Sequence, residues 1–388
     1  MAAPAREDSR VGELLAARTE ANERFFAAHA PAIARLCHRM AERFARGGRL
    51  LAVGSTPAAR SDVRHVAVEF VHPVIVGKRA LPAIGITSEL ALQVRLLAEA
   101  EDIVIAFGDG SEVADAVAAA RSRGCLTLAF AEVGAEWAFP PPGDDAQMRQ
   151  ELAETLYHVL WELVHVFFEH RGLLEGRTAR REHDAGASSF LYPFLAERET
   201  DLDGVLADVE ASVLMKAREV AELRAQTLTE GRDVLLAAAD ALRARFDAGG
   251  MLLALGNGGS ATDAQDVVAD FRAAGRAALD LSEDPSILSA IANDIGVEAI
   301  FSRQVIAYGR AGDALLALST SGTSGNVIAA LAEARRRGLL TIAMVGYDGG
   351  RIAAEGLADH VVVSRSQHIP RIQEAQASAY HALVELAG

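Results

Sequence analysis

A short apolar run that stops at a glycine-rich turn is the feature that most constrains this chain. Residues 251–255 are all apolar, and residues 256–260 are Gly-Asn-Gly-Gly-Ser. Glycines without a Cβ atom let the backbone approach a ligand closely. Thr262 or Asp263 can then cap a helix whose first N–H groups point back toward the turn. A strand, a glycine turn and a helix start together predict an anion site, usually for phosphate, although many such turns only join a strand to a helix.

A second stretch repeats this arrangement. Residues 314–318 predict a buried strand, and residues 319–324 supply five hydroxyl groups before a helical pattern over 327–337. Hydroxyls and N–H groups at a helix start can satisfy phosphate oxygens without a lysine. A turn that hydrogen-bonds only to itself is the alternative. Because ligands bind at the carboxyl ends of strands in open α/β sheets, two such loops favour binding.

Composition and charge exclude several classes of function. The chain has 388 residues, 51% of them hydrophobic, which allows two domains with large cores. A net charge of −15 and 5% aromatic residues argue against a nucleic-acid partner. Two cysteines predict a reduced, cytoplasmic protein. The N-terminus lacks a signal-peptide pattern and no apolar run approaches 18 residues, so we expect no export and no membrane span.

The order of predicted elements occurs twice along the chain. Residues 8–48 predict helices, and short strands at 49–53, 83–86, 103–107 and 126–131 alternate with turns and helices up to 147–168. This alternation predicts a mainly parallel sheet covered by helices on both faces, of the flavodoxin-like doubly wound type. Residues 243–256 match residues 41–54, and residues 371–386 match residues 148–163. We interpret the chain as a tandem duplication, with domains at 8–170 and 205–388 and a connector at 171–204.

Several motifs in the second half resemble, in the same order, those of the sugar isomerase (SIS) domain. They are GNGGSATDA, AIANDIG at 290–296, STSGTSGNV, GYDGG at 346–350 and RIQEAQASAYHALVEL at 371–386. Within this family the motifs are most similar to the phosphoheptose isomerases, over roughly 205–388. The resemblance implies a phosphate site, and it implies substrate contacts at Asp294 and Gln373. The phosphate-binding residues would be Asn257, Gly258, Gly259, Ser260, Ser319, Thr320, Ser321 and Ser324.

The resemblance also implies a divalent metal ion. In the phosphoheptose isomerases a His and a Glu four residues apart on one helix, and a Gln and a His eight residues apart on another, look like zinc ligands. Side chains at i and i+4 share a helix face, so the first pair makes physical sense. The N-terminal domain keeps all four positions, as His65, Glu69, Gln150 and His158. A surface ion pair is the alternative interpretation of His65 and Glu69.

The two domains differ in which motifs of the family they contain. The phosphate loops of the N-terminal domain are replaced by Gly54-Ser55-Thr56-Pro57 and by Gly108-Asp109-Gly110-Ser111, in which Asp109 would repel phosphate. The C-terminal domain keeps both loops but has Asp266 and Asp270 where His and Glu are expected. Ala274 and Pro370 replace an arginine and an aspartate of the family. A weaker second metal set would be Asp266, Asp270, Gln373 and His381, whose carboxylates favour Mg²⁺ or Mn²⁺ over Zn²⁺.

The resemblance implies an aldose–ketose isomerase that converts sedoheptulose 7-phosphate to glycero-manno-heptose 7-phosphate through a metal-assisted enediolate. The catalytic groups would be Asp270 or Glu69 as the base and His381 or His158 as its partner. We expect a homo-oligomer, a dimer of tandem chains; whether the domains share one site is left open. The alternative is a non-catalytic regulatory or assembly protein that binds a sugar phosphate. It is motivated by the loss of expected family residues at four positions, Asp266, Asp270, Ala274 and Pro370.

Overall fold

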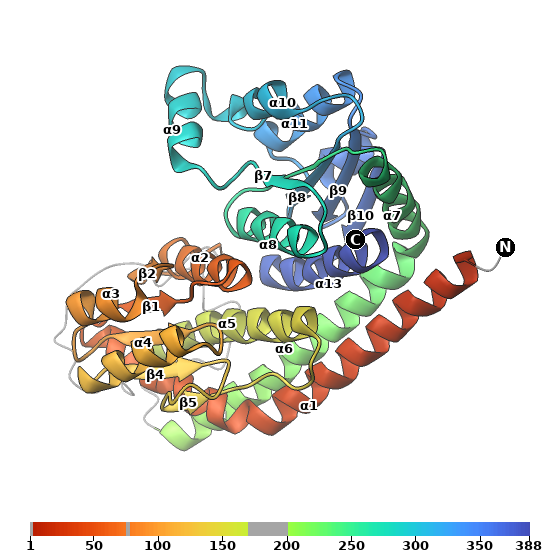
Figure 1. Ribbon diagram of the computed structural model, residues 1–388. Helices are drawn as coiled ribbons and strands as arrows, with labels where there is room; N and C mark the ends of the chain where they lie inside the picture. Colours follow the sequence, from red (N-terminus) through yellow and green to blue (C-terminus); the bar gives the residue numbers. More distant parts are fainter. Residues whose placement is uncertain (1–2, 75–77, 170–200) are drawn as a thin grey trace. The chain divides into compact units, whose positions relative to one another are not determined.

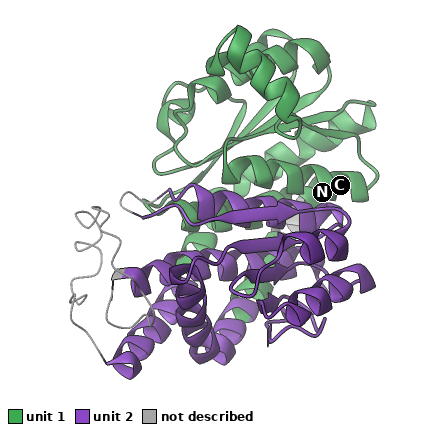
Figure 2. Ribbon diagram, turned by 90° about the vertical axis from the view of Figure 1, so that its left-hand side faces the viewer, with its two compact units in different colours: residues 1–20, 219–388 green, residues 21–218 purple. Residues whose placement is uncertain are grey.

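The computed structural model describes residues 3–74, 78–169 and 201–388, and it divides into two compact units. Unit 1 contains residues 1–20 and 219–388, and unit 2 contains residues 21–218 (Figure 2). Helices α1 (Ala3–Ala45) and α6 (Leu202–Glu230) each contribute residues to both units. The units therefore differ from the ranges 8–170 and 205–388 at these helix ends. Most of the predicted connector, 171–204, lies outside the described residues.

Unit 2 contains one parallel sheet with the strand order β2-β1-β3-β4-β5 (Figure 1). Its strands are β1 (Leu50–Val53), β2 (Ala83–Ile86), β3 (Ile103–Ala106), β4 (Leu126–Ala129) and β5 (Trp137–Ala138). Besides parts of α1 and α6, its helices are α2 (Pro57–Val71), α3 (Leu90–Leu97), α4 (Ser111–Ser122) and α5 (Ala146–Glu169).

Unit 1 contains a second parallel sheet with the order β7-β6-β8-β9-β10. Its strands are β6 (Leu252–Leu255), β7 (Ala278–Asp280), β8 (Ala314–Ser319), β9 (Leu340–Gly346) and β10 (His360–Ser364). The helices are α7 (Arg232–Asp247), α8 (Gly259–Ala273), α9 (Pro285–Asp294), the 3-10 turn η3 (Val297–Ala299), α10 (Ser302–Tyr308), α11 (Gly325–Arg336), α12 (Gly350–Ala354) and α13 (Ile369–Ala387). Numbered by position within its unit, each sheet has the order 2-1-3-4-5, which is the flavodoxin-like order.

The central strands of both sheets are buried on both faces. In β1, Leu50 and Ala52 belong to a core under α1, α2 and α5, whereas Leu51 and Val53 belong to a separate core under α3 and α4. In β6, Leu252 and Leu253 likewise pack into different cores. Successive residues of a strand point to opposite faces, so strands covered on both sides have continuous apolar sequences. The predicted fold class, two parallel α/β domains, is therefore confirmed.

Three local predictions need correction. Residues 8–48 do not form separate helices: α1 is one helix through Ala45, with Pro31 in its interior. The strand β5 was missed because two residues carry no apolar pattern. Neither Thr262 nor Asp263 caps α8, since the helix already begins at Gly259. No helix among the described residues is sufficiently long and apolar to cross a membrane.

Candidate phosphate loops and histidine cluster

The glycine turn of unit 1 is shaped by contacts that only glycine permits. A Cβ atom on Gly256 would lie 2.2 Å from the carbonyl oxygen of Ser260, so any side chain there would clash with the backbone. Gly258 has φ 57° and ψ −126°, a conformation that L-residues rarely adopt. This conformation lets α8 start directly after the turn, and the Thr262 hydroxyl donates to the carbonyl of Gly259 inside its first turn. The first N–H groups of α8 thus lie at the turn, as the anion site requires.

The second loop joins β8 to α11 and is tied to the first by a pair of amide side chains. Asn257 Nδ2 donates to Asn326 Oδ1 at 3.0 Å, and Asn326 Nδ2 donates to Asn257 Oδ1 at 3.0 Å. Within the loop, Ser319 Oγ accepts from the N–H of Gly322 at 3.2 Å. The structure therefore brings the two predicted loops together at the carboxyl ends of β6 and β8. Sequence reasoning missed Asn326, although it ends the STSGTSGN motif.

The remaining substrate candidates of unit 1 lie in different surroundings. Asp294 is exposed at the end of α9, where its carboxylate accepts from the side-chain amide of Asn293 at 2.8 Å. Gln373 is buried near the start of α13. Ser282, which sequence reasoning also missed, accepts from the N–H of Gly256 at 3.3 Å and so supports the glycine turn.

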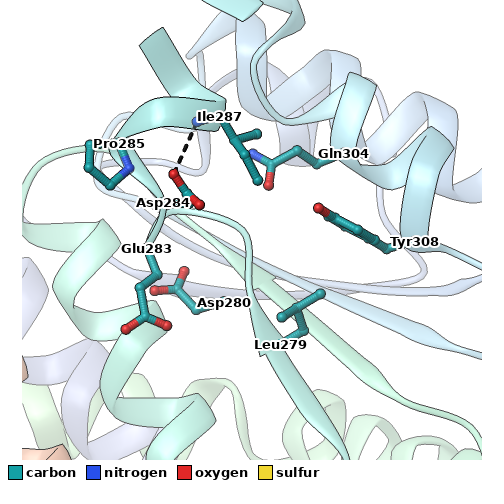
Figure 3. A pocket seen from close by; sticks show the side chains of 8 residues that line it. All are labelled: Leu279, Asp280, Glu283, Asp284, Pro285, Ile287, Gln304 and Tyr308. Carbon is teal, nitrogen blue, oxygen red and sulfur yellow. Dashed lines mark hydrogen bonds between the residues drawn. The ribbon is translucent and has the colours of Figure 1, made fainter. Parts of the chain in front are cut away.

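A cavity of about 520 Å³ lies beside β7, α9 and α10, and Figure 3 shows its lining. Three carboxylates, those of Asp280, Glu283 and Asp284, face it together with Gln304 and Tyr308. None of the residues predicted to bind phosphate lines it. Asp284 also caps α9 by accepting from the N–H groups of Ser286 and Ile287. Because carboxylates repel phosphate, this cavity is not a phosphate site.

In unit 2, residues from α2 and α5 form a buried histidine cluster. The Nε2 atoms of His65 and His158 lie 3.2 Å apart, and His65 Nε2 lies 4.0 Å from Glu69 Oε1. All three side chains are buried, and one ligand atom from each lies within 4.8 Å of the others. Burial, and then the neighbouring His158, hold the pKa of His65 well below its usual value, so the ring is neutral. Two buried imidazoles beside a carboxylate are a donor set that suits a divalent ion.

Gln150 lies in the first turns of α5, the helix that also carries His158. Its Nε2 donates to Asp62 Oδ1 on α2 at 3.2 Å. Its Oε1 is buried and has no hydrogen-bond partner among the described residues. A buried carbonyl oxygen without a donor is costly unless another group satisfies it. The four positions assigned by the family resemblance therefore lie on the two helices α2 and α5, and the histidines and Glu69 are in mutual reach.

The corresponding positions of unit 1 form a different arrangement. His381 Nε2 lies 3.3 Å from Asp266 Oδ2 and 3.7 Å from Asp270 Oδ2. The hydroxyl of Tyr380 donates to the same oxygen of Asp266 at 3.1 Å. Asp266 and His381 are buried, whereas the side chain of Asp270 is 22% exposed. This group is a hydrogen-bonded carboxylate–imidazole pair with one further carboxylate at its edge.

The loops of unit 2 that replace the phosphate loops are occupied by a side chain of the protein. Ser55 Oγ donates to Glu112 Oε2 at 2.8 Å, and Glu112 lies in the first turn of α4. The hydroxyl of Thr56 caps α2 by accepting from the N–H of Ala59 at 3.2 Å. A carboxylate therefore already lies at the strand ends where a phosphate would otherwise bind.

Comparison with known proteins identifies the class. The SIS domain family matches residues 217–346. A relative from Pelodictyon phaeoclathratiforme is 41% identical over 175 residues, which is 43% of this chain and 82% of the relative. A relative from Desulfovibrio desulfuricans is 45% identical over 177 residues, covering 44% of this chain and 83% of the relative. The chain belongs to the SIS domain family.

Both relatives are named phosphoheptose isomerase, and that name applies to less than half of this chain. Two solved structures match nearly all of it and show the fold alone. The C-terminal domain of glucosamine-fructose-6-phosphate aminotransferase from Francisella tularensis has a TM-score of 0.62 at 8% identity, covering 96% of this chain and 93% of that one. Tagatose-6-phosphate ketose/aldose isomerase from Escherichia coli has a TM-score of 0.57 at 14% identity, covering 97% and 92%. The chain is thus an SIS protein with two parallel-sheet domains that resembles phosphoheptose isomerase in part.

Proposed function

We propose that the protein is an aldose–ketose isomerase that acts on a phosphorylated sugar. The observation that supports this most strongly is the combination of intact phosphate loops in unit 1 with relatives that share more than 40% identity and the name phosphoheptose isomerase. The substrate that follows from these relatives is sedoheptulose 7-phosphate, with glycero-manno-heptose 7-phosphate as the product.

The phosphate group would bind at the paired loops of unit 1. Backbone N–H groups at the starts of α8 and α11 point to this edge and favour an anion. The hydroxyl donors would be Ser260, Ser319, Thr320, Ser321 and Ser324. Because the protein carries a net charge of −15, these local donors must outweigh an unfavourable overall field.

A divalent ion would bind at the histidine cluster of unit 2, and the residues present fit zinc. Two nitrogen ligands of one tetrahedral zinc lie about 3.3 Å apart, because each Zn–N bond is about 2.0–2.1 Å. The observed separation of 3.2 Å between the Nε2 atoms of His65 and His158 agrees with this geometry. Glu69 and the unsatisfied Oε1 of Gln150 would complete the ligands. Such an ion polarises a carbonyl oxygen and so stabilises the negative charge that develops when the neighbouring carbon loses a proton.

Two pairs of side chains have the chemistry to move the proton. A carboxylate, Asp270 or Glu69, would take the proton from the carbon beside the carbonyl, which leaves an enediolate. The imidazole of His381 or His158 would give a proton to the carbonyl oxygen and take one from the neighbouring hydroxyl. Return of the first proton to the adjacent carbon then exchanges ketose and aldose. No proton is gained or lost overall.

We further propose a cytoplasmic homo-oligomer, a dimer of these two-domain chains. Light scattering after size exclusion should give about twice the mass of one chain, which is 41.0 kDa. A monomer would contradict this part of the proposal.

The function is tested by incubating the purified full chain with sedoheptulose 7-phosphate and, separately, with unphosphorylated sedoheptulose. We expect an aldose product from the phosphorylated sugar only, because unit 1 recognises the phosphate. Ser321→Ala should raise KM about tenfold, in line with the loss of one hydrogen bond to a charged group. No product, together with an increase in melting temperature on adding the sugar phosphate, would favour the regulatory alternative. The departures at Asp266 and Asp270 motivate that alternative.

A further inference from the structure

Tyr347, in the loop between β9 and α12, has a backbone conformation that favours glycine. Its φ is 53°, and among the described residues the only other non-glycine residue with a positive φ is Glu89 of unit 2. The N–H of Gly349 donates to the carbonyl of Gly346 at 2.9 Å, so Tyr347 holds the first central position of a tight turn. The second central residue, Asp348, has no positive φ. Turns with this pattern normally have glycine at the first central position.

This turn lies directly against the second phosphate loop, residues 319–324. The strands β8 and β9, which lead into the two segments, are parallel neighbours in the sheet. A Cβ atom on Gly346 would clash with the carbonyl oxygen of Thr320, and one on Gly350 would clash with that of Ser321. Consecutive Cα atoms are only about 3.8 Å apart, so the side chain of Tyr347 starts within reach of the same loop.

The contacts of the Tyr347 side chain within the protein do not explain why a tyrosine is present. Glycine would adopt this conformation without the cost that a Cβ atom brings. The side chain is half-buried, and among the described residues it forms no hydrogen bond, ion pair or ring contact. Backbone strain of this kind is concentrated at ligand sites. A phenol offers a ring face and a hydroxyl that both donates and accepts, which are groups that suit a sugar.

We propose that Tyr347 is a specificity-determining residue that contacts the sugar part of the ligand while residues 319–324 hold its phosphate. This inference rests on the proposed function and adds to it a residue that recognises the sugar. The hydroxyl of Tyr347 hydrogen-bonds a sugar hydroxyl near the phosphate. The turn is fixed to the phosphate loop for this purpose, because the N–H of Ile352 donates to the carbonyl of Gly322 at 3.0 Å.

The inference predicts opposite effects of one substitution on stability and on binding. Tyr347→Gly removes the backbone strain and should raise the melting temperature by about 1–3 °C. It also removes the sugar contact, so calorimetry should show affinity for sedoheptulose 7-phosphate at least about tenfold weaker. Affinity for inorganic phosphate, which has no sugar, should change less than about twofold. Tyr347→Phe keeps the ring and the strain; it should weaken sugar-phosphate affinity about fivefold with the melting temperature within about 1 °C.

Glu89→Gly is the matched control, because it relieves the same kind of conformation in unit 2, outside the phosphate loops. It should leave both affinities unchanged. Three results would overturn the inference: unchanged sugar-phosphate affinity in Tyr347→Gly, an equal loss of affinity for inorganic phosphate, or a lower melting temperature in this variant.

The inference and the proposed function can fail separately. A wild type that binds sedoheptulose 7-phosphate without isomerising it would contradict the proposed function, and the affinities of the Tyr347 variants would still decide the role of this residue. A wild type that binds inorganic phosphate but not the sugar phosphate would contradict both.

Discussion

The imidazole rings of His65 and His158 face each other in unit 2, with their Nε2 atoms 3.2 Å apart. The residues are far apart in sequence, and α2 and α5 bring them together above the sheet. Two buried imidazoles at this separation gain little from each other, because at most one proton can lie between them. A zinc ion bound to both histidines, as proposed for this cluster, would give the buried pair a function.

Zinc should therefore stabilise the folded chain more than magnesium does. Imidazole ligands favour zinc, whereas magnesium prefers oxygen ligands and water. We expect zinc at a concentration well above its Kd to raise the melting temperature by at least about 2 °C, and His158→Asn to abolish the increase. His72→Gln, an exposed histidine directly after α2, is the control and should keep the full effect. An equal increase with magnesium would contradict the assignment of ligands.

Substitutions of Asn257 and Asn326 should have coupled effects, because the two side-chain amides bond each other. Each side chain both donates to and accepts from the other, so removing either one leaves the partner amide unsatisfied. Asn257→Ala and Asn326→Ala should each weaken the binding of the sugar phosphate by about 1–2 kcal/mol. The double variant should be little worse than either single variant, which calorimetry can measure. Additive effects would show that the two loops are not coupled. Ser122→Ala, at the C-terminal end of α4 in unit 2, is the control.

Phosphate recognition should be confined to the loops of unit 1. Ser324→Ala removes a hydroxyl at the start of α11 and should weaken sugar-phosphate affinity about tenfold. The matched control in unit 2 is Ser111→Ala at the start of α4, where Glu112 already supplies a negative charge. Affinity measured by calorimetry should not change in this control. A comparable loss in both variants would mean that unit 2 also binds the phosphate.

Acid should destabilise unit 2 partly through Asp102. Burial alone would raise the pKa of Asp102, but hydrogen bonds from the Arg49 side chain and from the N–H groups of Glu99 and Arg49 outweigh it and lower the pKa. The stability that these bonds contribute is present above the unfolded pKa of about 3.9, and it is lost as the pH falls below that value through the folded pKa.

Denaturant unfolding between pH 3 and pH 7 tests this behaviour. Asp102→Asn should lower the free energy of unfolding by about 2 kcal/mol at pH 7 and by less at pH 3. The exposed Asp109→Asn is the control and should change little at either pH. A constant effect of Asp102→Asn across this range would contradict the role of the ionised carboxylate.

Much of the fold follows from local patterns that the sequence displays. Strands such as 103–106 and 252–255 are short apolar runs between turn residues, and doubly covered strands must be apolar on both faces. The placement of Ala3–Ala45 was harder, since nothing local shows that one continuous helix contributes to both units. The two-residue strand at Trp137–Ala138 exists only through its pairing with β4.

The candidate sites were predictable to different degrees. The i,i+4 spacing of His65 and Glu69 places them on one helix face, but their proximity to His158 was implied only by the family resemblance. The Asn257–Asn326 pair, the Ser55–Glu112 bond and the Tyr380–Asp266 bond depend on how separate elements pack. Sequence spacing contains no signal for such contacts. For the same reason the sequence predicts Asp266 as a weak metal ligand and gives no sign of its contact with His381.

Proton exchange is the measurement that tests the central claim most directly. The purified protein is incubated in D₂O with sedoheptulose 7-phosphate and followed by proton NMR, with and without a zinc chelator. We predict deuterium at the carbon next to the carbonyl, an aldose product that appears with it, and slower exchange in the chelated sample. Absence of deuterium from the sugar, in a protein whose melting temperature still rises on adding it, would contradict the isomerase assignment and leave a sugar-phosphate-binding SIS protein.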